Sequence, residues 1–162
     1  MRTLLLALLP VLVAGCAGPM LAGSVAPGAT REDVVAKAGR PTNVVALPGG
    51  GQRLQYSMQP MGHYVFMVDV DGSGKVVRSQ QVMAAAQFQR IEPGKWTRDD
   101  VLREFGPPAM VDGVASWQGP VWTYRFKEGN EPMFYWVYFD PQGIAQRAHP
   151  GMEFVNAPND RD

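Results

Sequence analysis

The sequence predicts an α+β fold made of two repeated units, each a short helix followed by an antiparallel β-meander of about three strands. The chain has 162 residues, 46% of them hydrophobic, which fits one globular domain or two small ones. Its 18 glycines and 14 prolines favour many turns and short strands over a helix bundle. An internal repeat sets the number of units at two.

The repeat aligns residues 30–41 with residues 97–108, and six of the twelve aligned positions are identical. The likeness continues downstream, where residues 64–71 match residues 133–140 and each segment runs into a glycine-containing turn. A single unit is small for a stable core. We therefore expect the two units to share one sheet or to pack closely against each other.

Each repeat begins with residues that start and stop a helix. Thr30 and Thr97 suit the N-cap position, and the aspartate three residues after each completes a capping box. Gly39 and Gly106 suit the left-handed position after the last turn, and a proline follows each of them. Two short amphipathic helices are therefore expected between these residues.

The N-terminus has the pattern of a bacterial signal peptide. Arg2 precedes an apolar run at residues 4–13, which is too short to span a bilayer, and small residues lead to Cys16, the only cysteine. Residues 12–16 resemble the lipobox of bacterial lipoproteins. The resemblance implies cleavage before Cys16 and acylation of Cys16, and Ala17 implies sorting to the outer membrane. A membrane-spanning helix, or a cytosolic protein with a buried thiol, is the alternative.

These observations predict how the chain divides into segments. The connector has no run of Gly, Pro or Ser and is expected to be ordered. The predicted segments are a lipoprotein signal peptide (1–15), the acylated cysteine and a tether (16–26), a first unit (27–83), a connector (84–90), a second unit (91–155) and a C-terminal tail (156–162).

The second repeat carries a pattern that resembles a known family. The pattern comprises Gly94, Thr97, Asp100-Val101, Phe105-Gly106, Pro108, Trp122-x-Tyr124 and Val137-x-Phe139-Asp140-x-x-Gly143. It resembles the SmpA/OmlA (BamE-like) outer-membrane lipoproteins, and the first repeat matches it more weakly. That family carries one such unit. The tandem arrangement resembles the β-lactamase inhibitor protein fold, in which two halves form one curved sheet that grips an enzyme.

The resemblance implies a non-enzymatic lipoprotein at the periplasmic face of the outer membrane. It would act by protein–protein interaction in envelope integrity or in outer-membrane β-barrel protein assembly, with the β-barrel assembly machinery as a possible partner. An inhibitor of a periplasmic β-lactamase or lysozyme, or a small-ligand or lipid-binding lipoprotein, are the alternatives. The 15 basic and 15 acidic residues balance, so no nucleic-acid partner is expected.

The sequence contains no pattern typical of a catalytic or metal-binding site, and no cofactor is expected. Residues 69–76 resemble part of a calcium loop, but Gln80 stands where the closing carboxylate is required, so a hairpin turn is favoured. His63 and His149 have no neighbouring His or Cys at metal-ligand spacing, and each is expected at the surface or at a strand end.

The second unit is crowded with aromatic residues. In a strand, Phe134, Trp136 and Tyr138 share one face, and the residues between them share the other. One face must pack under the helix, and the other either forms an interaction surface or is covered by the first unit. The candidate partner-binding residues are Trp122, Trp136 and Tyr138.

Overall fold

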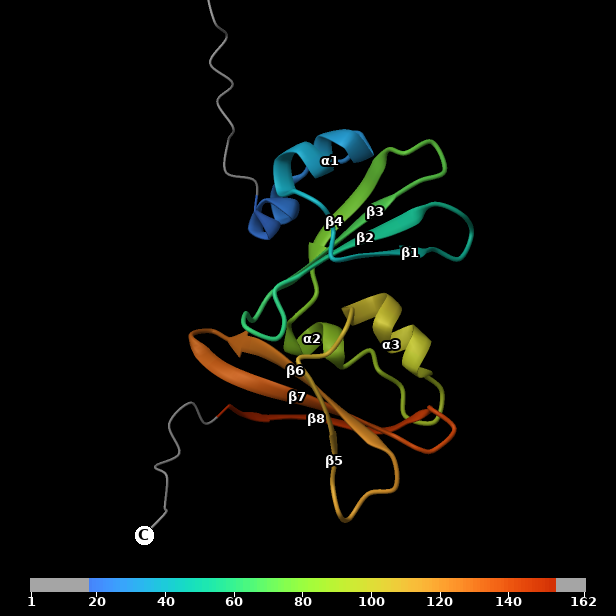
Figure 1. Ribbon diagram of the computed structural model, residues 1–162, viewed down its shortest axis with the longest axis vertical. Coiled ribbons are helices and arrows are strands. Elements are labelled where there is room, and N and C mark those ends of the chain that lie inside the picture. Colours follow the sequence, from blue (N-terminus) through green and yellow to red (C-terminus); the bar gives the residue numbers. More distant parts are fainter. Residues whose placement is uncertain (1–17, 154–162) are drawn as a thin grey trace, which may run out of the picture.

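The computed structural model describes residues 18–153 (Figure 1). The first unit contains η1 (Pro19–Ser24), α1 (Arg31–Ala38), β1 (Asn43–Ala46), β2 (Gln52–Ser57), β3 (Val65–Val70) and β4 (Val76–Gln81). The second contains α2 (Ala85–Phe88), α3 (Arg98–Phe105), β5 (Met110–Gly113), β6 (Pro120–Glu128), β7 (Glu131–Phe139) and β8 (Ala145–Met152). Among the described residues, none of the helices has both the length and the apolar character required to cross a membrane.

The predicted fold class is wrong. The described residues form mostly two four-stranded antiparallel sheets, ordered β1-β2-β3-β4 and β5-β6-β7-β8, and only 19% of them are helical. The strands missed were β1 and β5, which have four residues each and no buried residue. Without an alternation of buried and exposed positions, their sequences carry no strand period. The single curved sheet of an inhibitor-like tandem is also absent, because the two sheets are separate.

The predicted starts of the two helices are confirmed. Thr30 and Thr97 each cap the helix that follows, and both capping boxes are complete. The helix ends differ in detail from the prediction. Gly39 and Gly106 have φ of 83° and 76°, but ψ of −168° and −173° is extended rather than left-handed helical. Side chains are essentially excluded from that region of φ and ψ, so only glycine fits there.

A buried tyrosine fastens each helix end to its sheet. The Tyr56 hydroxyl donates to the carbonyl of Gly39 at 3.0 Å, and the Tyr124 hydroxyl donates to the carbonyl of Gly106 at 2.9 Å. Complete burial raises the pKa of Tyr124 well above its usual value, so this hydroxyl remains a donor. The same contact in both units extends the repeat from sequence to side-chain geometry.

The first sheet lies in the middle of the molecule, between two layers of helix (Figure 1). All six residues of β3 are buried. Val68 belongs to the core shared with η1 and α1, whereas Met67 belongs to the core that contains Phe88 and Phe105 of α2 and α3. The predicted connector is therefore ordered, since it holds α2 and the fully buried Phe88.

Part of the predicted tether belongs to the folded unit. Residues 19–24 form η1, Ala22 is fully buried, and the hydroxyl of Ser79 in β4 donates to the Ala22 carbonyl at 2.7 Å. The first unit therefore begins before residue 27. Cys16 and the signal peptide lie outside the described residues, as do the whole predicted tail (156–162) and residues 154–155 of the predicted second unit.

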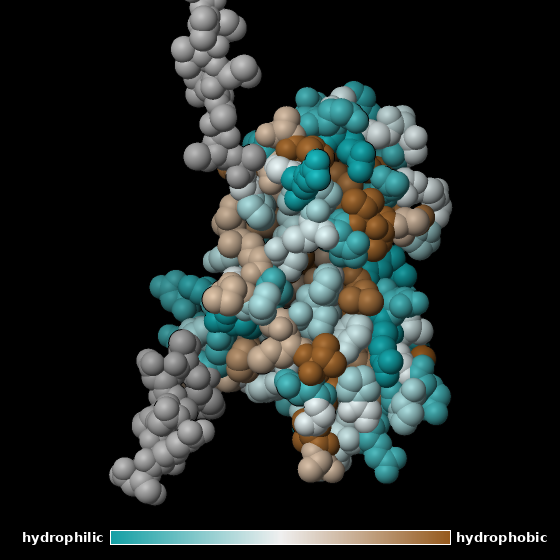
Figure 2. All heavy atoms as spheres, in the orientation of Figure 1, coloured by the Kyte–Doolittle hydropathy of each residue, from teal (hydrophilic) through white to brown (hydrophobic). Residues whose placement is uncertain are grey.

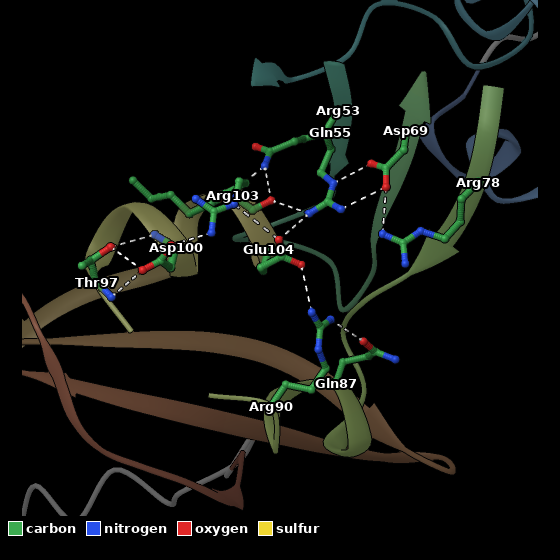
Figure 3. A network of polar contacts seen from close by, with 11 residues as sticks. Arg53, Gln55, Asp69, Arg78, Gln87, Arg90, Thr97, Asp100, Arg103 and Glu104 are labelled. Atoms are coloured by element: carbon green, nitrogen blue, oxygen red, sulfur yellow. Dashed lines mark hydrogen bonds and ion pairs between the residues drawn. The ribbon is translucent and has the colours of Figure 1, made fainter. Parts of the chain in front are cut away.

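A buried polar network joins the two units (Figure 3). Arg53 of β2 contacts both carboxylate oxygens of Asp69 at 2.6 Å and 3.0 Å, and it reaches Glu104 of α3 at 3.0 Å. Beside it, the amide of Gln55 donates to the Leu102 carbonyl at 2.9 Å. These contacts occupy carbonyls in the last turn of α3 and hold that helix against the first sheet.

The charges in this network compensate one another. Burial works to raise the pKa of Asp69, but hydrogen bonds from Arg53 and Arg78 outweigh burial and lower it. Glu104 also pairs with Arg90, at 3.3 Å, just after α2. One arginine thus meets a carboxylate from each unit, and neither carboxylate is left as a lone buried charge.

We expect Arg53→Met to destabilise the protein by about 3–5 kcal/mol, because it leaves Asp69 and Glu104 buried without their shared cation. Arg78→Met is the matched control. It removes a second arginine from the same Asp69, but the Arg78 side chain is 53% exposed, so we expect a loss below about 1 kcal/mol. Urea unfolding followed by tryptophan fluorescence measures both. Equal losses would contradict the assigned role of Arg53.

Candidate functional site: the outer face of the second sheet

The second sheet has one packed face and one open face. Its inner face carries Tyr135, Val137 and Phe139, all buried in the core formed with α2 and α3. Its outer face carries Phe134, Trp136 and Tyr138, which are half-buried. The predicted alternation along β7 is therefore confirmed. In Figure 1, α2 and α3 lie on one side of this sheet, and the described residues place no helix on its other side.

The outer face carries a continuous row of five rings, which we call the aromatic strip. The centroids of Phe134 and Trp136 are 5.8 Å apart, and those of Trp136 and His149 are 5.3 Å apart. His149 stacks on Tyr138 at 5.4 Å, and Trp117 meets Tyr138 edge-on at 5.5 Å. These separations lie in the range of favourable aromatic pairs.

The neighbouring strand and a loop fix the rings of the aromatic strip. Trp136 lies over Gly151 of β8, so closely that an added Cβ would clash with the indole ring. The indole N–H of Trp117 donates to the Phe139 carbonyl at 2.8 Å, which holds the loop after β5 against the sheet. Arg147 places its guanidinium 5.0 Å from the Tyr138 ring centre. These contacts hold the rings of the aromatic strip in place.

A groove of about 310 Å³ lies at one end of the aromatic strip. Its lining residues come from both units: Pro60, Ala109, Met110, Arg125, Phe134 and Glu153. The first unit contributes the loop between β2 and β3, where Gln59 exchanges two hydrogen bonds with the backbone of Arg125, at 2.7 Å and 3.1 Å. The first unit thus reaches one end of the outer face.

The polar side of this groove is internally neutralised. Glu153 pairs with Arg125, and its other oxygen lies 3.1 Å from Nε2 of His63. Burial works to raise the pKa of Glu153, but its hydrogen bonds from Arg125 and His63 outweigh burial and lower it. Sequence patterns could not reveal this cluster, because its members lie far apart in the chain.

Trp122 is not part of the outer face, which corrects the sequence grouping of Trp122 with Trp136 and Tyr138. The register pairs Trp136 with Thr123, so Trp122 points to the opposite side of the sheet. There it is 8% exposed and packs on Phe139 with ring centroids 4.7 Å apart. The strand can be predicted from its residues but its pairing cannot, and a shift of one residue moves a side chain to the other face.

The remaining sequence candidates have structural roles. Asp69 is engaged by arginines, and Asp71 accepts bonds from Ser73 and Lys75 in the turn between the paired strands β3 and β4, which confirms the predicted hairpin turn. His63 is held by Glu153, and His149 belongs to the aromatic strip. Within residues 18–153, no group of three or more His, Cys, Asp or Glu side chains is placed to hold a metal ion.

No protein-family model and no curated protein matches the chain, so the SmpA/OmlA resemblance rests on the motif residues alone. Two solved structures show weak likeness. A DUF4309 family protein (YjgB) from Bacillus subtilis subsp. subtilis str. 168 is 15% identical over 77% of this chain and 79% of that chain, with a TM-score of 0.31. An extracellular protein containing an SCP domain from Bacillus anthracis str. Ames is 14% identical over 78% and 44%, with a TM-score of 0.30. These TM-scores are too low to bear on function.

Substituting the two tryptophans separates a core role from a surface role. We expect Trp122→Ala to lower the free energy of unfolding by about 3–5 kcal/mol, because it opens a cavity beside Phe139. We expect Trp136→Ala to cost about 1–2 kcal/mol, since its ring is only half-buried. Urea unfolding of the two variants measures the difference. A larger loss for Trp136→Ala would place the core on the other face.

Proposed function

We propose that this protein is a non-enzymatic, lipid-anchored protein of the bacterial outer membrane that binds a partner protein through the outer face of its second sheet. The observation that carries the proposal is the aromatic strip. Large aromatic side chains are enriched at protein interfaces, where they act as rigid anchors. Here they stand on a sheet face that the helices of the described residues leave open.

The two ends of the molecule suit such a role. The described chain begins at η1, which packs on the first unit, and the predicted lipid anchor at Cys16 precedes it closely in sequence. The aromatic strip belongs to the sheet farthest from η1 along the stack of layers (Figure 1). A molecule tethered through Cys16 would hold this face away from the bilayer and toward periplasmic partners.

The SmpA/OmlA resemblance supports a role in envelope integrity or in outer-membrane β-barrel protein assembly, with the assembly machinery as the partner to test first. The inhibitor alternative rested on a single curved sheet formed by both units, and the two sheets are separate. The carrier alternative needs a cavity between sheet and helices, and in the second unit the rings of Phe88, Phe105 and Tyr135 occupy that space. The aromatic strip favours protein binding over the carrier alternative, and only the motif resemblance favours the assembly role over the inhibitor.

Lipidation is tested at Cys16. We expect the wild-type protein to incorporate radiolabelled fatty acid and to fractionate with outer membranes, and we expect Cys16→Ser to lose both properties. The thiol is the acceptor of the first lipid, and several acyl chains are needed for firm anchoring. Label retained in Cys16→Ser would refute the proposed anchor without touching the proposed binding face.

Partner binding is tested by mild cross-linking of the full-length protein in membranes, followed by pull-down and mass spectrometry. We expect β-barrel assembly components to be recovered and Trp136→Ala to reduce their recovery at least several-fold, as for the loss of an interface anchor. The control is Val77→Ala, which removes an apolar side chain that is 54% exposed on β4 of the other sheet.

If the wild type and Val77→Ala recover the same partner and Trp136→Ala does not, the binding face is assigned. Recovery that is unchanged in Trp136→Ala would remove the outer face from the proposal. A stoichiometric complex with a soluble periplasmic enzyme would instead favour the inhibitor class, and extracted lipid would favour the carrier.

A further inference from the structure

The strand register places an acid and a base at opposite edges of the outer face of the second sheet. Asp112 of β5 is paired with Val121 of β6, which is paired in turn with Tyr138 of β7. Tyr138 is paired with Arg147 of β8. Directly paired residues point to the same side of a sheet, so these four side chains form one row across the outer face. The row begins with a carboxylate and ends with a guanidinium.

The two charges at the ends of this row have no opposite charge to pair with. Asp112 and Arg147 are both exposed, and neither forms an ion pair within residues 18–153. Three strand spacings of about 4.8 Å put their backbones about 14 Å apart, which keeps them from pairing within one molecule. Arg125 on the same face, in contrast, is neutralised by Glu153. The two edges therefore carry charges of opposite sign that are available to another molecule.

Between the two edges, the outer face is largely apolar. The aromatic strip occupies its middle, and Met110 extends the apolar area onto β5. Met110 is 41% exposed and begins the next row of outward side chains, which ends at His149 of β8. Figure 2 shows hydrophobic atoms over β5 on the visible face of the molecule. An apolar and aromatic centre with charges at its rim is the composition of a protein interface.

We propose that this face binds a second copy of the chain, in a two-fold symmetric dimer whose axis runs parallel to the strands between β6 and β7. This axis stacks the two sheets face to face and places β5 of each copy opposite β8 of the other. Asp112 of each copy then faces Arg147 of the other, so two ion pairs form together. Stacked sheets lie about 10 Å apart, a gap that these two side chains span jointly.

The positions of the charges select this axis. A two-fold axis across the strands would stack β5 on β5 and β8 on β8, and Asp112 would not meet Arg147. The axis parallel to the strands also sets each residue of β6 opposite the β7 residue with which it is paired. Lys127 therefore lies opposite Pro132 and meets no like charge. The face is complementary to itself in charge, which is what a symmetric interface requires of its surface.

The size of the face predicts a reversible dimer. With about 4.8 Å between strands and 3.4 Å per residue, a sheet of four short strands presents an area on the order of 500 Å². Stable interfaces bury about 800 Å² on each partner, so this dimer is weak and dissociates on dilution. The second copy and the proposed partner protein bury the same rings and exclude each other. That competition rests on the proposed function, whereas the dimer itself does not.

Reversing the charges tests the dimer. Sedimentation equilibrium of the purified full-length protein, in a detergent matched to the density of the solvent, measures the dissociation constant. We expect Asp112→Arg and Arg147→Asp each to weaken the dimer roughly tenfold or more, because each sets like charges opposite one another at two places. A chain that carries both changes regains the affinity. The control Glu32→Arg, at an exposed position of α1 in the first unit, leaves the dimer unchanged.

Thiol cross-linking tests the orientation of the two copies. An equimolar mixture of Asp112→Cys and Arg147→Cys is treated with a short bismaleimide. We expect cross-linked dimers in the mixture but not in either variant by itself, because the two Asp112 positions of a dimer lie at opposite edges. The mixed dimer also keeps one of its two ion pairs intact. The wild type, with Cys16 as its only cysteine, measures the background.

Three outcomes overturn the inference. They are a wild type that stays monomeric at every concentration, a doubly reversed chain that does not regain affinity, and equal cross-linking in the mixture and in the separate variants. A monomeric wild type that still recovers a partner through Trp136 would assign the face to a foreign protein only. A dimer with the expected properties, from a protein that recovers no partner, would remove the proposed function and leave the inference intact.

Discussion

The interaction on which the rest of the structure depends is the contact of Arg53 with Asp69 and Glu104. It is the point where the first sheet and α3 meet, and it is almost completely removed from water. A buried charge is tolerated only when it is paired and hydrogen-bonded. One arginine that satisfies a carboxylate from each unit therefore fixes how the second unit sits against the first, and the hydrophobic contacts of Met67 with the second core close around it.

This contact between the units explains why their sheets differ in exposure although the units themselves are similar. Both units have a capped helix, a tyrosine bonded to the helix end, and a four-stranded sheet. The sheet of the first unit is covered on both faces, by its own helix and by that of its neighbour. The sheet of the second unit has only its own helices to cover it. Because the units stack in one direction, the outer face of the second sheet has no neighbouring layer to cover it. This face carries the aromatic strip.

The local features of the fold followed from the sequence, and the pairings did not. Capping by Thr30 and Thr97 depends on residues three positions apart, so the chain itself shows it. β1 and β5 escaped prediction because their side chains are exposed, and a strand without a buried face has no period to recognise. The face of Trp122 depends on register with β7, which residue spacing alone does not determine. The Arg53 network and the groove at Glu153 join residues distant in the chain, and no local pattern marks them.

The arrangement also explains how so small a protein keeps one wide sheet face uncovered. The polar network and the loop that holds Arg125 lie where the two units meet. The surfaces there are buried between the units, so they cannot contact a partner. η1 occupies one face and one edge of the first sheet, close in sequence to the proposed anchor at Cys16. What remains is the outer face of the second sheet, which ends at Phe134 in the groove. A partner that used this face would be recognised by contacts with the rings of the aromatic strip, because the other large faces are already buried.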